Sequence, residues 1–181
     1  TADARNEKAF WNYVRTDPKN LEMVQMIAHY ISNVIEDGYI ENRVLNNFPG
    51  TLGYGLEKLR ERHFEQILTV TQLIEQEDEE SHIFESILQI MLSYAKFGEI
   101  KYGDEPLSDE RIQAVFGLIT DIDSALMSRS GKDRLNVVNM VLVRCWDYIE
   151  SFCEECKKRQ EEAITSGGSA SLAETLAEAL G

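Results

Sequence analysis

The chain has 181 residues, 43% of them hydrophobic and 28% charged, which suits one globular domain with a tail. Its formal net charge of −14 repels phosphate backbones and anionic lipids, so we expect neither nucleic acid nor a membrane surface as a partner. The sequence contains no apolar run of about 18 residues, the length that spans a bilayer. These properties direct attention to protein or small-molecule partners.

The cysteines and the start of the chain bear on its compartment. Cys145, Cys153 and Cys156 are too few and too close together for a disulfide framework, so we expect an intracellular protein, cytoplasmic or nuclear. The chain starts at Thr1 without an initiator methionine or an apolar signal segment. We therefore expect it to be an excised part of a longer intracellular protein.

Apolar residues that recur three and four positions apart predict a series of amphipathic helices. In chain order, the expected helices cover residues 4–15, 18–37, 39–48, 56–76, 83–97, 108–126 and 135–156. Asp17 and Pro18 fit the cap and first turn of the second helix, and Gly38 is expected to end it. The glycine-containing stretch 49–55 is expected to be irregular.

The stretch 135–156 is apolar around most of its circumference. Residues such as Val138, Leu142 and Ile149 recur at helical spacing, and few polar residues interrupt them. We expect one long helix in the middle of a bundle, because such a helix buries more than one face. No stretch alternates apolar and polar residues as a strand does, so the sequence predicts an all-α, compact bundle of six or seven helices.

The composition changes near the C-terminus. The expected parts are a helical bundle over residues 1–163, a flexible Gly/Ser linker over 164–171 and a short amphipathic helical peptide over 172–181. Leu172, Leu176 and Leu180 share one face of this peptide, and its glutamates lie opposite. An isolated helix this short is marginal in water, so its order must come from a surface against which it docks.

Several local patterns resemble parts of known reactive sites, but each lacks the remaining parts. Cys153 and Cys156 have the spacing of half a zinc site, without a second pair of ligands nearby. The Glu79-x-x-His82 unit occurs once, whereas di-iron bundles use it twice. The glycines of residues 50–55 lack the strand and the lysine of a phosphate-binding loop, and no Gly-x-Ser-x-Gly elbow is present. We therefore expect no catalytic residue, metal or cofactor, and we predict that the chain is not an enzyme.

Aromatic residues in predicted loops or at predicted helix ends mark the expected rim of a partner site. They are Phe48, Tyr54, Phe97 and Tyr102. Arg144 lies within the apolar stretch, where it is expected either to pair with an acidic neighbour or to bind the carboxylate of a peptide. The expected partner-binding set is completed by Leu172, Leu176 and Leu180.

These features favour a protein–protein interaction domain, an adaptor or scaffold, that binds a short amphipathic helix in a groove between its own helices. The bound helix is either the chain's own C-terminal segment or a segment of a partner. Two alternatives stay open. One is a homo-oligomerisation module that buries apolar helix faces against copies of itself, and the other is a metal-dependent enzyme built on a helical bundle.

Overall fold

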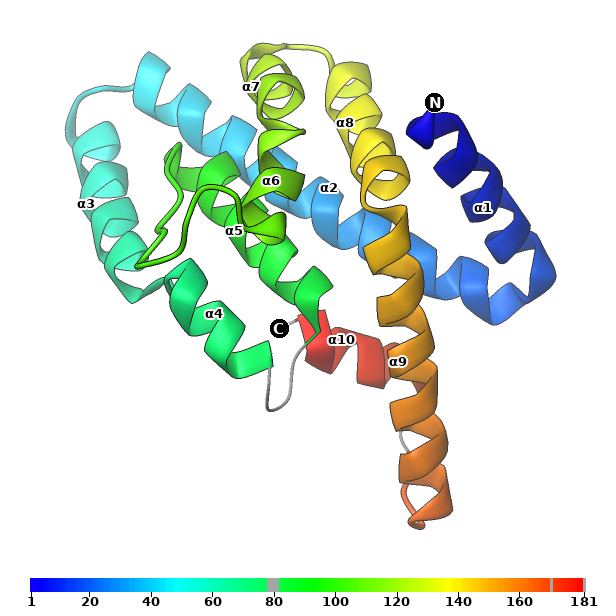
Figure 1. Ribbon diagram of the computed structural model, residues 1–181. Helices are drawn as coiled ribbons and strands as arrows, with labels where there is room; N and C mark the ends of the chain where they lie inside the picture. The colour runs from blue at the N-terminus through cyan, green and yellow to red at the C-terminus, as the bar shows by residue number, and fades with distance from the viewer. Residues whose placement is uncertain (78–81, 170, 181) are drawn as a thin grey trace.

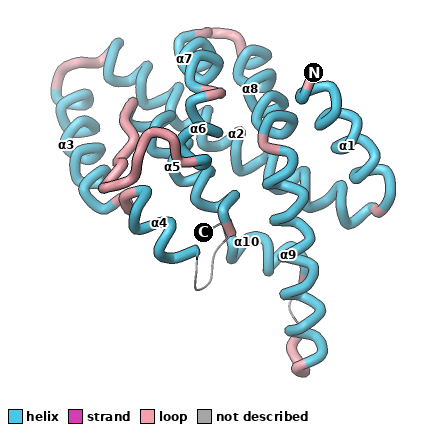
Figure 2. The backbone as a smooth tube through the Cα atoms, viewed as in Figure 1, coloured by secondary structure: helices cyan, strands magenta, loops and turns pink. Residues whose placement is uncertain are grey.

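The computed structural model describes residues 1–77, 82–169 and 171–180, and within these ranges the chain is all-helical, without a strand. The predicted all-α class is therefore confirmed. The helices are α1 (Ala2–Thr16), α2 (Pro18–Asn47), α3 (Thr51–Gln66), α4 (Val70–Glu77), α5 (Ile83–Phe97), α6 (Glu110–Phe116), α7 (Ile119–Met127), α8 (Gly131–Arg144), α9 (Trp146–Thr165) and α10 (Leu172–Leu180). Figure 2 shows that most connections between them are short, the longest described loop being the one between α5 and α6.

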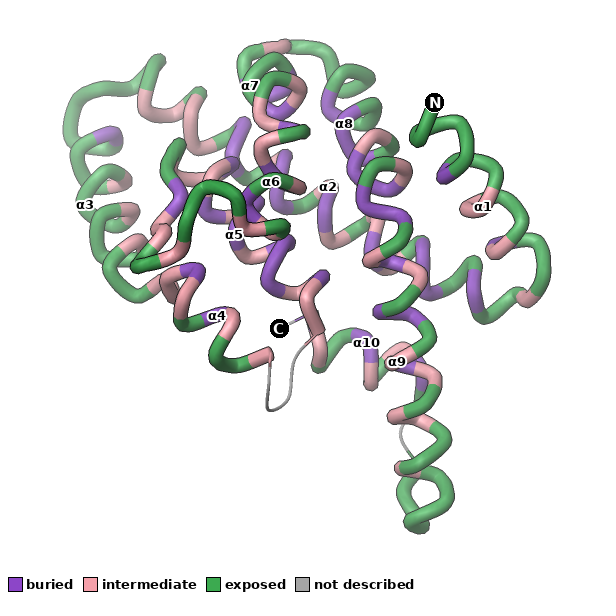
Figure 3. Tube along the Cα trace, in the orientation of Figure 1, coloured by how far each residue is buried: buried purple, intermediate pink, exposed green. Residues whose placement is uncertain are grey.

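The long helix α2 occupies the centre of the bundle. It crosses the molecule diagonally and contacts α1, α3, α5, α7, α8 and α10 (Figure 1). Ile27, Ile31 and Ile35 on its inward face are fully buried, and Phe84 and Met91 of α5 are equally buried. Figure 3 shows the buried positions following the inward faces of α2, α5 and α8. The central element is therefore α2, and not the stretch 135–156 that the apolar pattern favoured.

The start of α2 was predicted correctly, but its end was not. Asp17 caps the helix by accepting a hydrogen bond from the backbone N–H of Lys19 at 2.9 Å, and Pro18 forms the first turn, as predicted. The helix then continues through Gly38 to Asn47. A Cβ at Gly38 would lie 2.5 Å from the carbonyl oxygen of Ala95, so this glycine allows the backbones of α2 and α5 to approach closely. Gly38 marks a helix contact and not a helix end.

The predicted count of six or seven helices was too low, because three predicted helices are each divided in two, although the helix predicted over residues 39–48 is part of α2. The stretch 56–76 is interrupted at Ile67, whose backbone is extended, and 108–126 is interrupted at Gly117. A Thr69-x-x-Gln72 capping box restarts the chain as α4: the Gln72 N–H donates to Thr69 Oγ1 at 3.2 Å, and the Thr69 N–H donates to Gln72 Oε1 at 2.9 Å. The stretch 49–55 was also predicted wrongly, because α3 starts at Thr51 and includes its later glycines.

The third division falls within the stretch 135–156. Helix α8 ends at Arg144, Cys145 leaves helical geometry with φ −96° and ψ 15°, and α9 begins at Trp146. Both halves contact α1, but their other neighbours differ, since α8 contacts α2 and α7 whereas α9 contacts α5 and α10. A straight helix cannot contact both sets of neighbours, so the chain changes direction at Cys145. The apolar residues keep their helical spacing across this break, so the spacing alone does not reveal it.

Candidate functional site

The C-terminal helix α10 lies against α2 and α9 (Figure 1), and we call the area it covers the α10-binding surface. The chain reaches this surface through a sharp reversal after α9. Gly167 has φ +87°, and its N–H donates to the Ile164 carbonyl at 3.0 Å while the Gly168 N–H donates to the Ala163 carbonyl at 2.8 Å. This pattern is a Schellman motif, which needs glycine at the left-handed position. The reversal returns the chain toward the bundle.

Helix α10 starts with a complete capping box. The Glu174 N–H donates to Ser171 Oγ at 3.1 Å, and the Ser171 N–H donates to Glu174 Oε2 at 2.7 Å. These hydrogen bonds lower the pKa of the Glu174 carboxyl group. The box satisfies two backbone donors at the start of a helix that is too short to be stable alone. The Ser-x-x-Glu spacing is a local sequence signal for the start of this helix.

One face of α10 is buried and the other is exposed. Leu176 is fully buried, Leu172 and Leu180 are 7% and 8% exposed, and all three belong to the hydrophobic core cluster. Ala177 and Glu178 are exposed on the opposite face. The four-residue spacing places the leucines in one line along the helix, so α10 presents a leucine row to the bundle. Each buried leucine contributes about 1.5–3 kcal/mol relative to an exposed one.

The helices near α10 are held together by contacts between α5 and α9. His82 caps α5, because its Nδ1 accepts a hydrogen bond from the Phe84 N–H at 3.0 Å, and its Nε2 lies 3.0 Å from Ser151 Oγ. The ring of Phe152 packs against those of Phe84 and His82, with centroids 5.5 and 5.8 Å apart. Burial lowers the pKa of His82. The N-terminus of α5 is therefore fixed against the middle of α9.

A pocket of about 370 Å³ opens at the end of α10, and we call it the terminal pocket. Its lining includes Ala179 and Leu180 of α10, Leu73 of α4, and Glu85 and Gln89 of α5. Gln66 and Gln76 add two further amide groups to its wall. The Oε1 atom of Glu85 is buried without a hydrogen-bond partner among the described residues, and burial raises the pKa of this carboxyl group. The leucine row therefore ends at a pocket whose lining includes polar groups.

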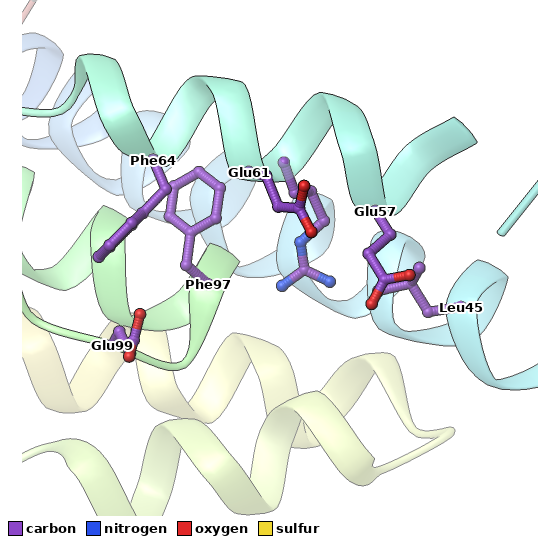
Figure 4. A pocket seen from close by; sticks show the side chains of 7 residues that line it. Leu45, Glu57, Glu61, Phe64, Phe97 and Glu99 are labelled. Carbon is purple, nitrogen blue, oxygen red and sulfur yellow. The ribbon is translucent and has the colours of Figure 1, made fainter. Parts of the chain in front are cut away.

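The aromatic residues of the predicted rim lie in other places. Phe48 follows α2 and Tyr54 lies on α3, and both are exposed. Phe97 meets Phe64 edge to face at 5.4 Å, at one end of a cavity of about 240 Å³ beside α3 (Figure 4). Tyr102 packs on the hydrophobic core from the loop after α5. None of these four aromatics is among the residues that line the terminal pocket.

Arg144 takes the ion-paired alternative that the sequence left open. Its Nη1 atom lies 2.8 Å from Asp121 Oδ2 and donates to the carbonyl oxygen of Gly117 at 2.8 Å. Its Nε lies 3.8 Å from the carboxylate of Asp3. The guanidinium therefore links α8 to α7 and α1, and its carboxylate partners come from the chain itself.

The patterns that resemble reactive sites fall in protected surroundings. Cys145, Cys153 and Cys156 are buried, and burial raises their pKa values to about 12, 12 and 11 respectively. Thiols in such surroundings stay protonated at neutral pH, which makes them poor nucleophiles. Of the Glu79-x-x-His82 unit, Glu79 lies outside the described residues, and His82 serves as the cap of α5. The described residues contain no group of three or more His, Cys, Asp or Glu side chains placed to hold a metal ion.

Comparison of the chain with protein-family models, curated proteins and solved structures finds no match. No helix in the described ranges has both the length and the apolar character that crossing a bilayer requires. The geometry of this chain defines the site: an all-helical bundle in which a terminal leucine row packs on a surface formed by two other helices.

Proposed function

We propose that the chain is a protein-interaction domain whose α10-binding surface accepts a short amphipathic helix with leucines four residues apart. In this chain α10 is the occupant, bound in cis. The observation that carries the proposal is the burial of Leu172, Leu176 and Leu180 on a segment joined to the bundle by a glycine reversal. A helix lying in a groove through leucines at this spacing is a recurrent mode of peptide recognition.

The chemistry of α10 defines the class of ligand. A competing helix needs apolar side chains of leucine size at three positions, and small or polar residues such as Ala177 and Glu178 on the outer face. A ligand longer than α10 would continue past Leu180 toward the terminal pocket. There the glutamine amides and the unpartnered Oε1 of Glu85 would hydrogen-bond to a polar residue of the ligand.

Tethering makes α10 a competitor that partners must displace. A short flexible link holds a segment at an effective concentration on the order of millimolar. The entropy cost of ordering α10 offsets much of the stabilisation from its leucines, so docking of α10 is expected to be reversible. A partner helix with the same leucine row and better contacts would then replace α10, which is a form of autoinhibition.

We propose a binding role without catalysis. The raised pKa values of the three cysteines support this, because their thiols are poor nucleophiles at neutral pH. The formal net charge of −14 supports a protein ligand over nucleic acid or an anionic membrane.

The test releases α10 without changing the rest of the chain. A protease recognition sequence is inserted after Gly168, which leaves the Schellman motif intact. After cleavage, a fluorescein-labelled peptide with the sequence of residues 169–181 is added, and binding is measured by fluorescence anisotropy. We expect the peptide to bind the cleaved chain and to bind the uncleaved chain at least tenfold more weakly, because tethered α10 competes.

Two variant peptides control for the leucine face. Leu176→Glu places a charge at a fully buried position and should abolish binding, whereas Ala177→Glu changes the neighbouring exposed position and should not. Equal binding of the two variants would refute the proposal, as would a loss of helical circular dichroism larger than the contribution of α10 itself when the released segment is dialysed away. A doubling of mass by light scattering, removed by Leu176→Glu in the whole chain, would instead support exchange of α10 between copies.

A further inference from the structure

A second hollow, of about 400 Å³, lies between the C-terminal part of α2 and the end of α7. Its walls carry side chains that are rich in hydrogen-bond donors: Tyr39, Asn42, Arg43, Asn46, Asn47 and Arg129. We call it the asparagine hollow. No residue of α9 or α10 lines it.

Arg134, which is itself nearly buried, fixes one side of the asparagine hollow. Its Nε donates to Glu36 Oε1 at 2.6 Å, and its Nη1 donates to the carbonyl of Ser128 at 3.0 Å. Its guanidinium carbon lies 3.8 Å from the ring centroid of Tyr39, a stacking distance. These contacts tie the turn between α7 and α8 to α2, so Arg129 on that turn is held at the rim.

Two positive charges at the hollow lack carboxylate partners. Arg43 Nη1 donates to Tyr39 Oη at 2.9 Å, and within the described ranges neither Arg43 nor Arg129 has a carboxylate within ion-pair distance. The nearby Glu36 is already paired with Arg134. Unpaired arginines that share a hollow on a chain with a net charge of −14 form a local positive field, which favours an acidic ligand.

The asparagines have the spacing of an extended peptide. Asn42 and Asn46 are four residues apart on α2, so they repeat after a rise of about 6 Å. Alternate residues of an extended chain repeat after about 6.6–6.8 Å. An asparagine amide offers both a donor and an acceptor, which match the C=O and N–H of a peptide unit. Arg43 and Asn47 repeat this spacing on the adjacent row of the helix.

The hollow also offers an apolar contact. Met127 is the last residue of α7, and it is 86% exposed. Methionine has a flexible apolar side chain, which is stabilised by packing against another apolar surface. Leu126, beside it, is almost buried. A ligand that covers Met127 would remove apolar surface from water while its acidic groups meet the arginines.

We propose that the asparagine hollow binds an extended acidic peptide segment, whose backbone pairs with Asn42 and Asn46 and whose carboxylates pair with Arg43 and Arg129. A peptide fits better than a nucleic acid, because the asparagine amides match the C=O and N–H groups of a peptide backbone. This site goes beyond the proposed function, since it recognises extended acidic chains and not amphipathic helices.

The test uses the whole chain and a fluorescein-labelled peptide of about ten residues in which glutamate and threonine alternate, a pattern that favours extended structure. Binding is followed by anisotropy and by the side-chain amide signals of Asn42, Asn46 and Asn47 in ¹⁵N spectra. We expect saturable binding, shifts of these signals, and weaker binding as salt rises from about 50 to about 300 mM. The double variants N42A/N46A and R43A/R129A should each weaken binding at least about tenfold.

Matched controls lie on the same helices or close to them. Asn33→Ala on α2 and Arg62→Ala on α3 alter exposed residues that do not line the hollow, and both should leave binding unchanged. Absence of binding at low salt, or equal binding by all variants, would overturn the proposal. Tighter binding of inorganic pyrophosphate or of an oligouridylate at the same residues would overturn it as well, because the ligand would then be a phosphate compound.

Discussion

Nε2 of His82 lies 3.0 Å from Oγ of Ser151, which connects the first turn of α5 to the middle of α9. The other ring nitrogen, Nδ1, accepts the hydrogen bond that caps α5, so Nε2 carries the proton and donates to the serine. A neutral imidazole therefore serves both as a helix cap and as a link between two helices. Protonation of Nδ1 removes the cap.

This arrangement predicts that stability falls on mild acidification. Burial lowers the pKa of folded His82 below its unfolded value of about 6.5, so the unfolded chain binds the proton more readily. The contribution of His82 is complete above about pH 6.5 and is lost as pH falls through the lower pKa of the folded state. Urea unfolding at pH 7.5 and at pH 5.5 measures the difference. His82→Asn keeps a capping side chain that does not titrate, and it should reduce the loss of free energy between the two pH values.

The effect of Glu85 titration on stability must be distinguished from the effect of His82 titration. Burial raises the pKa of its carboxyl group, so protonation of Glu85 stabilises the folded state and acts against the His82 effect on acidification. Glu85→Gln removes that opposing titration, and the decline between pH 7.5 and pH 5.5 should then become at least as steep. A decline that persists unchanged in His82→Asn would show that another group is responsible.

Two glycines in helices should respond in opposite directions to alanine. At Gly38 the new Cβ would lie 2.5 Å from the Ala95 carbonyl oxygen, so α2 and α5 must move apart, at a cost of about 1–3 kcal/mol. At Gly55, inside α3, no atom lies within 4 Å of the new Cβ, and alanine should stabilise the helix by about 0.5–1 kcal/mol. Thermal unfolding of the two single variants compares them directly. Stabilisation by Gly38→Ala would mean that α2 does not pass close to Ala95.

Local sequence signals account for many of the helix boundaries. The Asp17 and Pro18 start of α2 follows from backbone chemistry that needs no tertiary context. The same holds for the end of α5 at Gly98, which has φ +72° and an N–H that donates to the Tyr94 carbonyl at 2.8 Å. The starts of α4 and α10 also carry a local signal, since Thr69 and Ser171 each open a capping box. The expected start of the tail helix at residue 172 agrees with α10, whereas the start of α4 was missed because the Thr69 box was not recognised.

The remaining features depend on which helices meet. The break at Cys145 and the continuation through Gly38 both follow from packing against particular neighbours, and periodicity contains no information about neighbours. The leucine row of the tail was predicted from the sequence, but its packing against α2 and α9 was not. The asparagine hollow was missed altogether, because its asparagines lie on α2 whereas Arg129 comes from the turn after α7.

The cysteines should be inert in the folded chain. The lowest of their raised pKa values, about 11 for Cys156, leaves roughly one thiol in a thousand ionised at pH 8, and burial blocks access to it. We therefore expect Ellman's reagent to label the native chain only on the timescale of opening, and to label all three thiols at once in about 6 M guanidinium chloride. Met127→Cys provides the control, because position 127 is exposed and the new thiol should react within the mixing time. Rapid labelling of Cys153 or Cys156 in the native chain would contradict the packing of α9 and reopen the question of a redox or metal role for the pair.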